Sequence, residues 1–176
     1  AREALLAAME AARDAGIPVS LDLNLRLENW GWDHGFRSVV TAAVARADIV
    51  CTVTTAADPV FSPGAIRPGT HINAVGSYQP HTVEIPPEAV KAARVFVDHR
   101  ESALAEAGDL IVPLQAGWID VGHILGEVGE VLAGRVQGRR GDEDITLFKS
   151  VGCAAEDCLA ASEILARADN ASPREP

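Results

Sequence analysis

The sequence predicts an α/β fold, with a mainly parallel sheet between helices in a three-layer α/β/α arrangement. Short apolar runs alternate along the chain with longer segments of helical period. Two of these runs, Ile49–Val53 and His71–Val75, resemble parallel strands buried on both faces. The first is followed by Thr54-Thr55 and the second by Gly76-Ser77, small residues typical of strand ends that open onto a ligand. Simple strand termination explains the same residues equally well.

Composition limits the classes of partner. The chain has 176 residues, which suits a single domain, and its formal net charge of −10 opposes nonspecific binding to nucleic acid or anionic membranes. No apolar run approaches membrane-spanning length and no signal sequence is present. The three cysteines (Cys51, Cys153 and Cys158) lack paired spacing, which favours free thiols and a cytoplasmic location. No cluster has metal-ligand spacing.

The first quarter of the chain predicts helix, strand, helix, strand. Residues 2–15 have helical period and Gly16 ends that helix. Residues 17–23 form the first predicted strand, and Asp33 is the expected N-cap of a helix over 34–46. That helix leads into the strand at 48–53, so right-handed crossovers and parallel pairing are expected.

The rest of the chain continues the alternation. Helices are expected at 86–93, 100–107, 121–133 and 151–168, and a strand or extended segment at 109–112, ended by Pro113. The predicted sheet uses strands near Val19–Leu23, Ile49–Thr54, Ile72–Val75, Val95–Asp98 and Ile145–Phe148. One domain is expected over residues 1–170, followed by a flexible tail at 171–176.

The string AGIPVSLDLNLRLENWGW resembles the PfkB carbohydrate kinases, particularly their 2-keto-3-deoxygluconate kinase branch, over about residues 11–50. The resemblance implies that Asn24 and Arg26, which follow Asp22, lie beside the sugar and phosphate-donor cleft. The Gly-Ala-Gly-Asp segment of that family is absent, and phosphoryl transfer needs its anion hole and base. A capped, hydrogen-bonded loop is therefore the favoured role of Asp22, Asn24 and Arg26.

Four later strings resemble the ornithine cyclodeaminase/mu-crystallin family over about residues 47–168: ADIVCTVTT, PGTHINAVGSYQPHTVEI, RVFVDHRESALAEAGDL and GRRGDEDITLFKSVGCAAEDCLAA. The resemblance implies a Rossmann-like domain that binds NAD or NADP. Around the nicotinamide it implies Thr54, Thr55, Val75, Gly76, Ser77 and Gly152. The helix predicted from Val151 is expected to offer unpaired N–H groups there.

Two departures from that family stand out. The chain has no G-x-G-x-x-G, the motif that holds the pyrophosphate after the first strand of a Rossmann domain. Tyr78 stands where the cyclodeaminase branch carries its catalytic Asp, which favours the reductase and mu-crystallin branch. No catalytic residue is therefore identified. His71 is expected to be a hydrogen-bonded core histidine and His81 an exposed one, while Asp98-His99-Arg100 should cap a helix. Arg139 and Arg140 are candidates for a phosphate contact, with a solvated turn as the default interpretation.

The two resemblances together predict a chimera, with a kinase-like helix-strand-helix at 1–46 joined to a cyclodeaminase-like half Rossmann domain at 47–170. The favoured function is an NAD(P)-binding fragment of an amino- or imino-acid reductase or cyclodeaminase lineage, incomplete as an enzyme. A chimeric or engineered scaffold without catalysis is the alternative, and a sugar kinase fragment is the second. A dinucleotide is the expected partner, and the chain is expected to be a monomer or a weak homo-oligomer.

Overall fold

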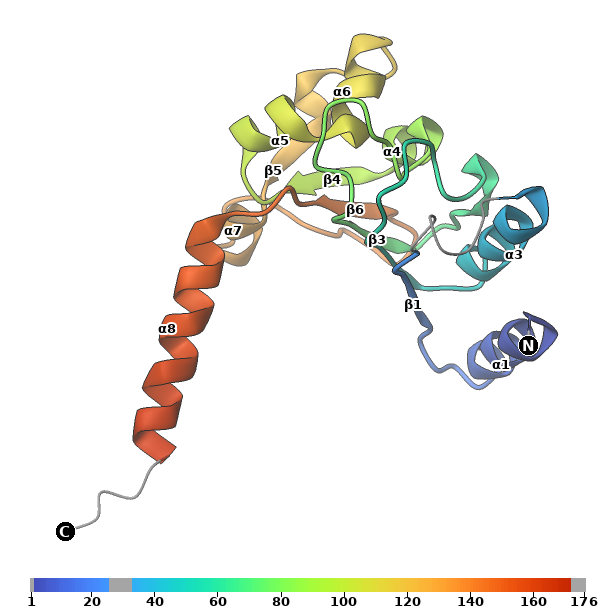
Figure 1. Ribbon diagram of the computed structural model, residues 1–176, viewed down its shortest axis with the longest axis horizontal. Coiled ribbons are helices and arrows are strands. Elements are labelled where there is room, and N and C mark those ends of the chain that lie inside the picture. Colours follow the sequence, from blue (N-terminus) through green and yellow to red (C-terminus); the bar gives the residue numbers. More distant parts are fainter. Residues whose placement is uncertain (1, 26–32, 172–176) are drawn as a thin grey trace.

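A six-stranded, fully parallel sheet forms the centre of the molecule (Figure 1). The computed structural model describes residues 2–25 and 33–171. The strands are β1 Ser20–Leu23, β2 Ile49–Thr52, β3 His71–Ala74, β4 Arg94–Val97, β5 Ile124–Glu127 and β6 Thr146–Lys149. Their order across the sheet is β1-β2-β3-β6-β4-β5. The α/β, Rossmann-like fold predicted from the sequence is therefore present.

Seven α-helices and two short 3₁₀-helices accompany the strands in the described residues. The α-helices are α1 Arg2–Asp14, α3 His34–Val44, α4 Pro87–Ala92, α5 Arg100–Glu106, α6 Gly108–Gln115, α7 Val128–Leu132 and α8 Ala154–Ala171. The 3₁₀-helices are η1 Pro63–Ala65 and η2 Val121–His123. As predicted, Asp33 is the N-cap of α3, and its side chain accepts a hydrogen bond from the Phe36 N–H at 2.7 Å. No helix among the described residues is long and apolar enough to cross a membrane.

The two faces of the sheet are covered unequally. Right-handed connections that run from β1 towards β5 put α3 to α6 on one face, whereas the return from β5 to β6 puts α7 on the other. Figure 1 shows α4, α5 and α6 above the sheet and α7 below it. Val50, Ile72 and Leu147 point into the covered face and are fully buried, while Ile49 on the opposite face is 37% exposed. This opposite face is called the open face below.

The strand before residue 47 continues the same sheet. β1 pairs with β2 in parallel register, with Leu21 opposite Val50 and Leu23 opposite Thr52. The pairing is supported at its start by Asp48, whose carboxylate accepts a hydrogen bond from the Val19 N–H at 2.8 Å. The predicted parallel continuation across residue 47 is thus present.

Two predicted elements are wrong. Residues 109–112, expected to be extended, belong to helix α6, which continues through Pro113 and buries Leu110 and Ile111. The single helix expected at 121–133 is instead η2, strand β5 and helix α7. A capping box between Glu127 and Glu130 begins α7 at residue 128, so the segment before it is free to pair with β4.

Helix α8 projects away from the sheet (Figure 1). The side chains over residues 154–168 are all exposed, including Leu159 at 71% and Leu165 at 65%. The helix predicted at 151–168 is therefore present with shifted bounds, and its face with Leu159 and Leu165 has no partner among the described residues. The predicted tail is only partly described, because Ala171 belongs to α8 and residues 172–176 lie outside the described part.

Candidate functional site

The candidate site lies where β2, β3 and β6 end. Thr52 is opposite Ala74, and Ala74 is opposite Lys149, so these three strands finish at the same level of the sheet. The segments that follow them therefore share one edge, which is the carboxyl edge at which parallel sheets bind ligands. The predicted cofactor residues all belong to these segments.

A buried carboxylate joins the first two segments. Glu84 is 0% exposed, and its Oε1 accepts a hydrogen bond from the Thr54 N–H at 2.6 Å. Its Oε2 accepts hydrogen bonds from the Ser77 N–H at 2.9 Å and from the Thr52 hydroxyl at 3.2 Å. Because one side chain binds the backbone beyond both strands, Glu84 fixes the separation between the two segments.

A buried ion pair lies behind Glu84. Asp109, at the start of α6, accepts hydrogen bonds from the N–H groups of Glu84 and Ile85 at 2.7 and 3.0 Å. Its other carboxylate oxygen lies 3.2 Å from Lys149 Nζ, at an angle that makes this an ion pair rather than an aligned hydrogen bond. Burial raises the pKa of Asp109, and the positive charge of Lys149 opposes this rise.

Glu84, Asp109 and Lys149 were missed by the sequence reasoning. Each is fully buried. The signal available in the sequence was a charged residue between apolar neighbours, as for Glu84 between Val83 and Ile85. A buried charge requires a partner, so such a residue predicts an internal polar network.

A second carboxylate holds the segment after β6. One oxygen of Asp98 accepts hydrogen bonds from the Ser150 hydroxyl at 2.7 Å and from the N–H groups of Val151 and Gly152 at 2.8 and 2.9 Å. Burial opposes ionisation of Asp98, but the hydrogen bonds from Ser150, His99, Gly152 and Val151 lower its pKa overall. The N–H groups expected to be unpaired here are therefore occupied, and α8 begins only at Ala154.

The predicted helix cap at Asp98-His99-Arg100 is present. The N-cap of α5 is His99, whose ring nitrogen Nδ1 accepts a hydrogen bond from the Ser102 N–H at 3.4 Å. The Asp98 carboxylate binds the His99 N–H at 2.7 Å and the turn after β6 instead.

The predicted cofactor residues divide into a buried and an accessible group. Thr54 and Ser77 are each only 2% exposed, and their hydroxyls bond internally, Thr54 to the Ala56 N–H and Ser77 to the Thr82 carbonyl. The half-buried Gly76 lies against the end of β2. The accessible residues are Thr55, Val75 at 42% exposure, and Gly152. Tyr78, in the segment after β3, is 56% exposed.

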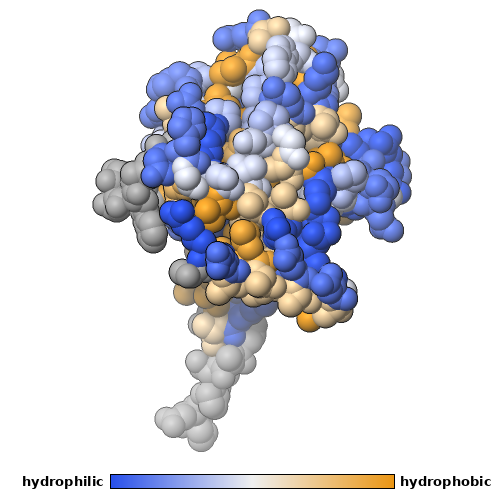
Figure 2. Space-filling view, turned by 90° about the vertical axis from the view of Figure 1, so that its right-hand side faces the viewer, coloured by the Kyte–Doolittle hydropathy of each residue, from blue (hydrophilic) through white to orange (hydrophobic). Residues whose placement is uncertain are grey.

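The kinase-like residues lie elsewhere. Asp22 and Asn24, on β1 and directly after it, line a cavity of about 280 Å³ that also contacts Leu5 of α1 and Phe36 of α3. At this end of the molecule, hydrophobic and hydrophilic residues are interleaved on the surface (Figure 2). Arg26 falls outside the described residues.

The remaining polar candidates make ordinary contacts. His71 is hydrogen-bonded to Thr146 and Asn73, as expected, but it is half-buried on a cavity wall rather than in the core. His81 is exposed, as expected. All three cysteines are free thiols. Over residues 2–25 and 33–171, no group of three or more His, Cys, Asp or Glu side chains is placed to hold a metal ion.

Comparison with known proteins identifies the lineage. The model of the ornithine cyclodeaminase/mu-crystallin family matches residues 36–172. Over 127 residues the chain is 43% identical to Delta(1)-pyrroline-2-carboxylate reductase of Bacillus cereus, a match that covers 72% of this chain and 39% of that protein. Ketimine reductase mu-crystallin of Mus musculus is 40% identical over 124 residues, covering 70% of this chain and 37% of the relative. The chain thus spans about two fifths of the length of these relatives.

Solved structures that superpose on this chain point to the same lineage. Thermococcus litoralis Delta(1)-pyrroline-2-carboxylate reductase, in complex with NADH and L-proline, superposes with a TM-score of 0.67 at 44% identity, covering 69% of this chain and 38% of that one. A probable ornithine cyclodeaminase from Bordetella pertussis superposes with a TM-score of 0.66 at 31% identity, covering 90% of this chain and 61% of that one.

The comparisons do not support the predicted kinase segment or the chimera. The family match begins at residue 36, before the expected junction at 47. The Bordetella structure covers more of the chain than residues 36–172 alone provide, so that alignment extends into the kinase-like segment. The match to the family model spans well over half of the residues, and the chain belongs to the ornithine cyclodeaminase/mu-crystallin family.

Proposed function

We propose that this chain forms the nicotinamide-facing part of an NAD(P)(H)-binding domain in an imino-acid reductase. The observation that carries the proposal is the shared carboxyl edge of β2, β3 and β6, where Thr55, Val75 and Gly152 remain accessible. Support also comes from the Thermococcus litoralis reductase, which has NADH bound and is 44% identical.

The geometry at this edge suits a flat ring. Gly76 allows the turn after β3 to lie against β2, because a Cβ atom at this position would come within 2.3 Å of both Thr54 N and Thr54 O. Val75 offers an apolar contact, and Thr55 and Gly152 leave room for the ring on either side. Glu84 and Asp98 hold these segments from behind, so the edge is ordered before a ligand arrives.

The residues at this edge fit the nicotinamide half of a dinucleotide, but not its pyrophosphate. No G-x-G-x-x-G is present, and the Val151 and Gly152 N–H groups already bind Asp98. The pyrophosphate would therefore need other partners. When bound, the nicotinamide supplies or accepts a hydride, and the role of this chain is to hold the ring and exclude water from one side.

The reductase branch is favoured over the cyclodeaminase branch. Tyr78 occupies the place expected for the cyclodeaminase Asp and is 56% exposed beside the edge. A neutral tyrosine is a weak general base at physiological pH. Cyclic imino carboxylates are the corresponding substrate class, as the names of the pyrroline-2-carboxylate reductase relatives indicate.

Cofactor titration tests the proposal. We expect saturable binding of NADH or NADPH, measured by calorimetry, and competition by reduced nicotinamide mononucleotide but not by ADP-ribose. The Val75→Glu variant should raise the NADH Kd by about tenfold or more, equivalent to about 1.4 kcal/mol. Leu132→Glu, at an 83% exposed position on α7, is the matched control and should leave the Kd unchanged.

A scaffold without cofactor is the second candidate. It is favoured by one observation, the absence of a phosphate-binding glycine loop. If neither NADH nor NADPH gives a saturable signal at about 1 mM, a concentration at which a binding free energy near −4 kcal/mol is detectable, the reductase proposal fails and the scaffold is supported.

A further inference from the structure

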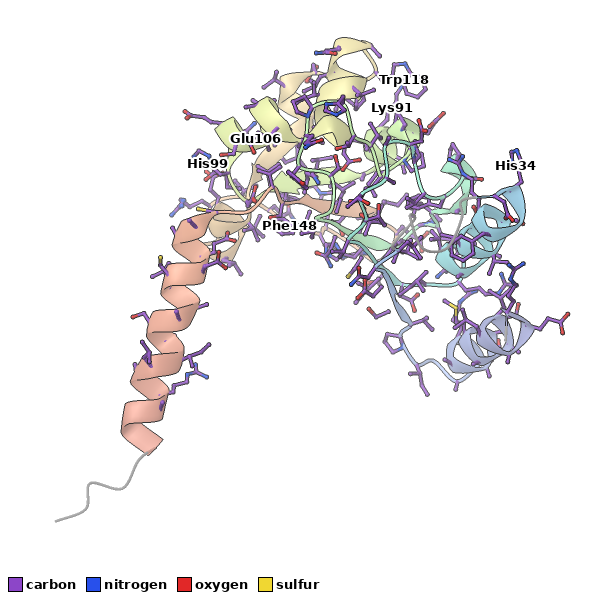
Figure 3. All side chains as sticks on the ribbon, in the orientation of Figure 1. His34, Lys91, His99, Glu106, Trp118 and Phe148 are labelled. Carbon is purple, nitrogen blue, oxygen red and sulfur yellow. The ribbon has the colours of Figure 1, made fainter. Side chains whose placement is uncertain are left out.

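A cavity of about 330 Å³ lies on the open face of the sheet, away from the cofactor edge. His71 and Thr146, the first residues of β3 and β6, form part of its wall, so it lies towards the amino ends of the strands. Phe148 is labelled in Figure 3, on the side of the sheet opposite α5. The cavity is lined by His71, Asn73, Phe96, Val128, Val131, Gly138, Arg139, Thr146 and Phe148. Its volume is at the lower end of the range for small-molecule sites, about 300–1,000 Å³.

A chain of hydrogen bonds orders the polar wall. Arg139 Nη2 lies 3.1 Å from Thr146 Oγ1 and must donate, because a guanidinium has no acceptor. His71 Nε2 faces Asn73 Oδ1, an amide oxygen that can only accept, so in the neutral ring the hydrogen is on Nε2 and Nδ1 accepts a hydrogen bond from the Thr146 hydroxyl at 2.8 Å. His71 Nε2 in turn donates to Asn73 Oδ1 at 3.2 Å.

This arrangement keeps His71 neutral. Burial lowers its pKa, the hydrogen bond to Asn73 acts in the opposite direction, and the charge of Arg139 lowers it further. The positive charge at the cavity is therefore that of Arg139.

Arg139 has no acidic partner among the described residues. It bonds the Thr146 hydroxyl and, weakly, the Asp142 carbonyl at 3.5 Å. The neighbouring Arg140, by contrast, forms an ion pair with Asp144 at 3.0 Å. The Arg139 guanidinium therefore has N–H groups available to pair with an anion at the cavity.

The rest of the lining is apolar. Phe96 and Phe148 form the floor on the sheet, and Val128 and Val131 of α7 form the opposite wall. An aromatic and aliphatic cavity with a single cation at its rim matches a ligand with an apolar body and one carboxylate.

We propose that this cavity binds a small monocarboxylate with a flat or branched apolar body. The carboxylate pairs with the free N–H groups of Arg139, and the apolar body lies between the two phenylalanines and Val131. The site is separate from the cofactor edge, so the inference does not depend on the proposed function.

A fluorinated probe tests this site directly. Titration of the full chain with 4-fluorophenylacetate, followed by ¹⁹F NMR, should give saturable binding, while the uncharged 4-fluorophenylacetamide should bind about tenfold more weakly. In Arg139→Gln the Kd of the acid should rise by about tenfold to approach that of the amide. Arg140→Gln, whose guanidinium pairs with Asp144, is the matched control and should keep the original Kd.

A second variant distinguishes the loss of the binding site from the loss of the fold. Val131→Trp fills the cavity from α7 and should abolish saturable binding while the far-UV spectrum stays unchanged. Equal affinities for the acid and the amide, equal effects of the two arginine substitutions, or no saturation by about 10 mM would each overturn the proposal. A titration in the presence of saturating NADH distinguishes this site from the cofactor edge, because the affinity for 4-fluorophenylacetate should stay unchanged.

Discussion

At the scale of single residues, two carboxylates fix the backbone at the carboxyl edge of the sheet. Glu84 binds the backbone after β2 and β3, and Asp98 binds the turn after β6. Charged acceptors are suited to this role because one carboxylate can accept several N–H groups, and such bonds are stronger than neutral ones. The accessible residues at the edge are small, so their position is set by these two side chains behind them.

The lowered pKa of Asp98 predicts a pH-dependent stability. Its carboxylate is hydrogen-bonded when folded, so the folded pKa lies below the ordinary 3.8 and the ionised form favours the folded state. The contribution is complete above about pH 4 and is lost as the pH falls through the folded pKa. We expect Asp98→Asn to reduce the free energy of unfolding by about 1 kcal/mol at pH 7, a modest value because the group is partly exposed to solvent.

Urea denaturation of the native chain and Asp98→Asn at a series of pH values measures this effect. The difference between the two proteins should be constant from neutral pH down to about pH 4 and should shrink below it. A difference that grows on acidification would contradict the role given to Asp98.

At the scale of elements, the turn after β3 packs closely against the end of β2. Gly76→Ala would place a Cβ atom within 2.3 Å of Thr54 N and O and within 2.5 Å of Glu84 Oε1. These neighbours are backbone and a buried carboxylate, so the turn itself must shift. We expect a loss of about 3 kcal/mol or more in the free energy of unfolding, together with weaker NADH binding.

Gly64→Ala is the matched control for this substitution. Gly64 lies in η1, and a Cβ atom there would meet nothing within 4 Å. Thermal unfolding should therefore show a large decrease in Tm for Gly76→Ala and almost none for Gly64→Ala. Similar values for the two variants would mean that the close approach of the turn to β2 does not persist in solution.

The elements also show what the sequence could and could not predict. Strong local signals were sufficient for α3, with its Asp33 cap, and for the apolar strands β2 and β3. Local signals failed for β5 and α7, because the apolar residues keep a helical spacing through both elements. The boundary between the two elements is set instead by the Glu127–Glu130 capping box and by the pairing of β5 with β4. Pro113 predicted the end of an extended segment, but it lies inside helix α6. Burial of the apolar face of α6 outweighs the backbone hydrogen bond that proline cannot donate.

The site was predictable only in part for a related reason. Thr54, Val75, Gly76 and Gly152 do belong to segments that meet at one edge, since strand ends in a parallel sheet share an edge. The burial of Thr54 and Ser77 was not predictable, because it depends on Glu84. This residue lies many positions along the chain from Thr54, and only the fold brings its carboxylate to the edge.

At the scale of the whole molecule, the folded body and α8 should behave as separate units. The side chains of α8 over residues 154–168 are exposed, and the helix is joined to the sheet through the turn held by Asp98. An isolated helix of 18 residues is only marginally stable in water, because most helix stability in proteins comes from packing. The sheet and helices α3 to α6, by contrast, share one core.

Removal of residues 154–176 should therefore leave the free energy of unfolding within about 0.5 kcal/mol of the intact chain. Leu110→Ala, on the buried face of α6, is the contrasting variant and should lower the free energy of unfolding by about 2–5 kcal/mol. Amide hydrogen exchange should show α8 nearly unprotected while β2, β3 and β6 are protected. If truncation instead lowers stability by an amount that increases with protein concentration, then Leu159 and Leu165 are buried between copies in solution, and α8 is part of an interface rather than a separate unit.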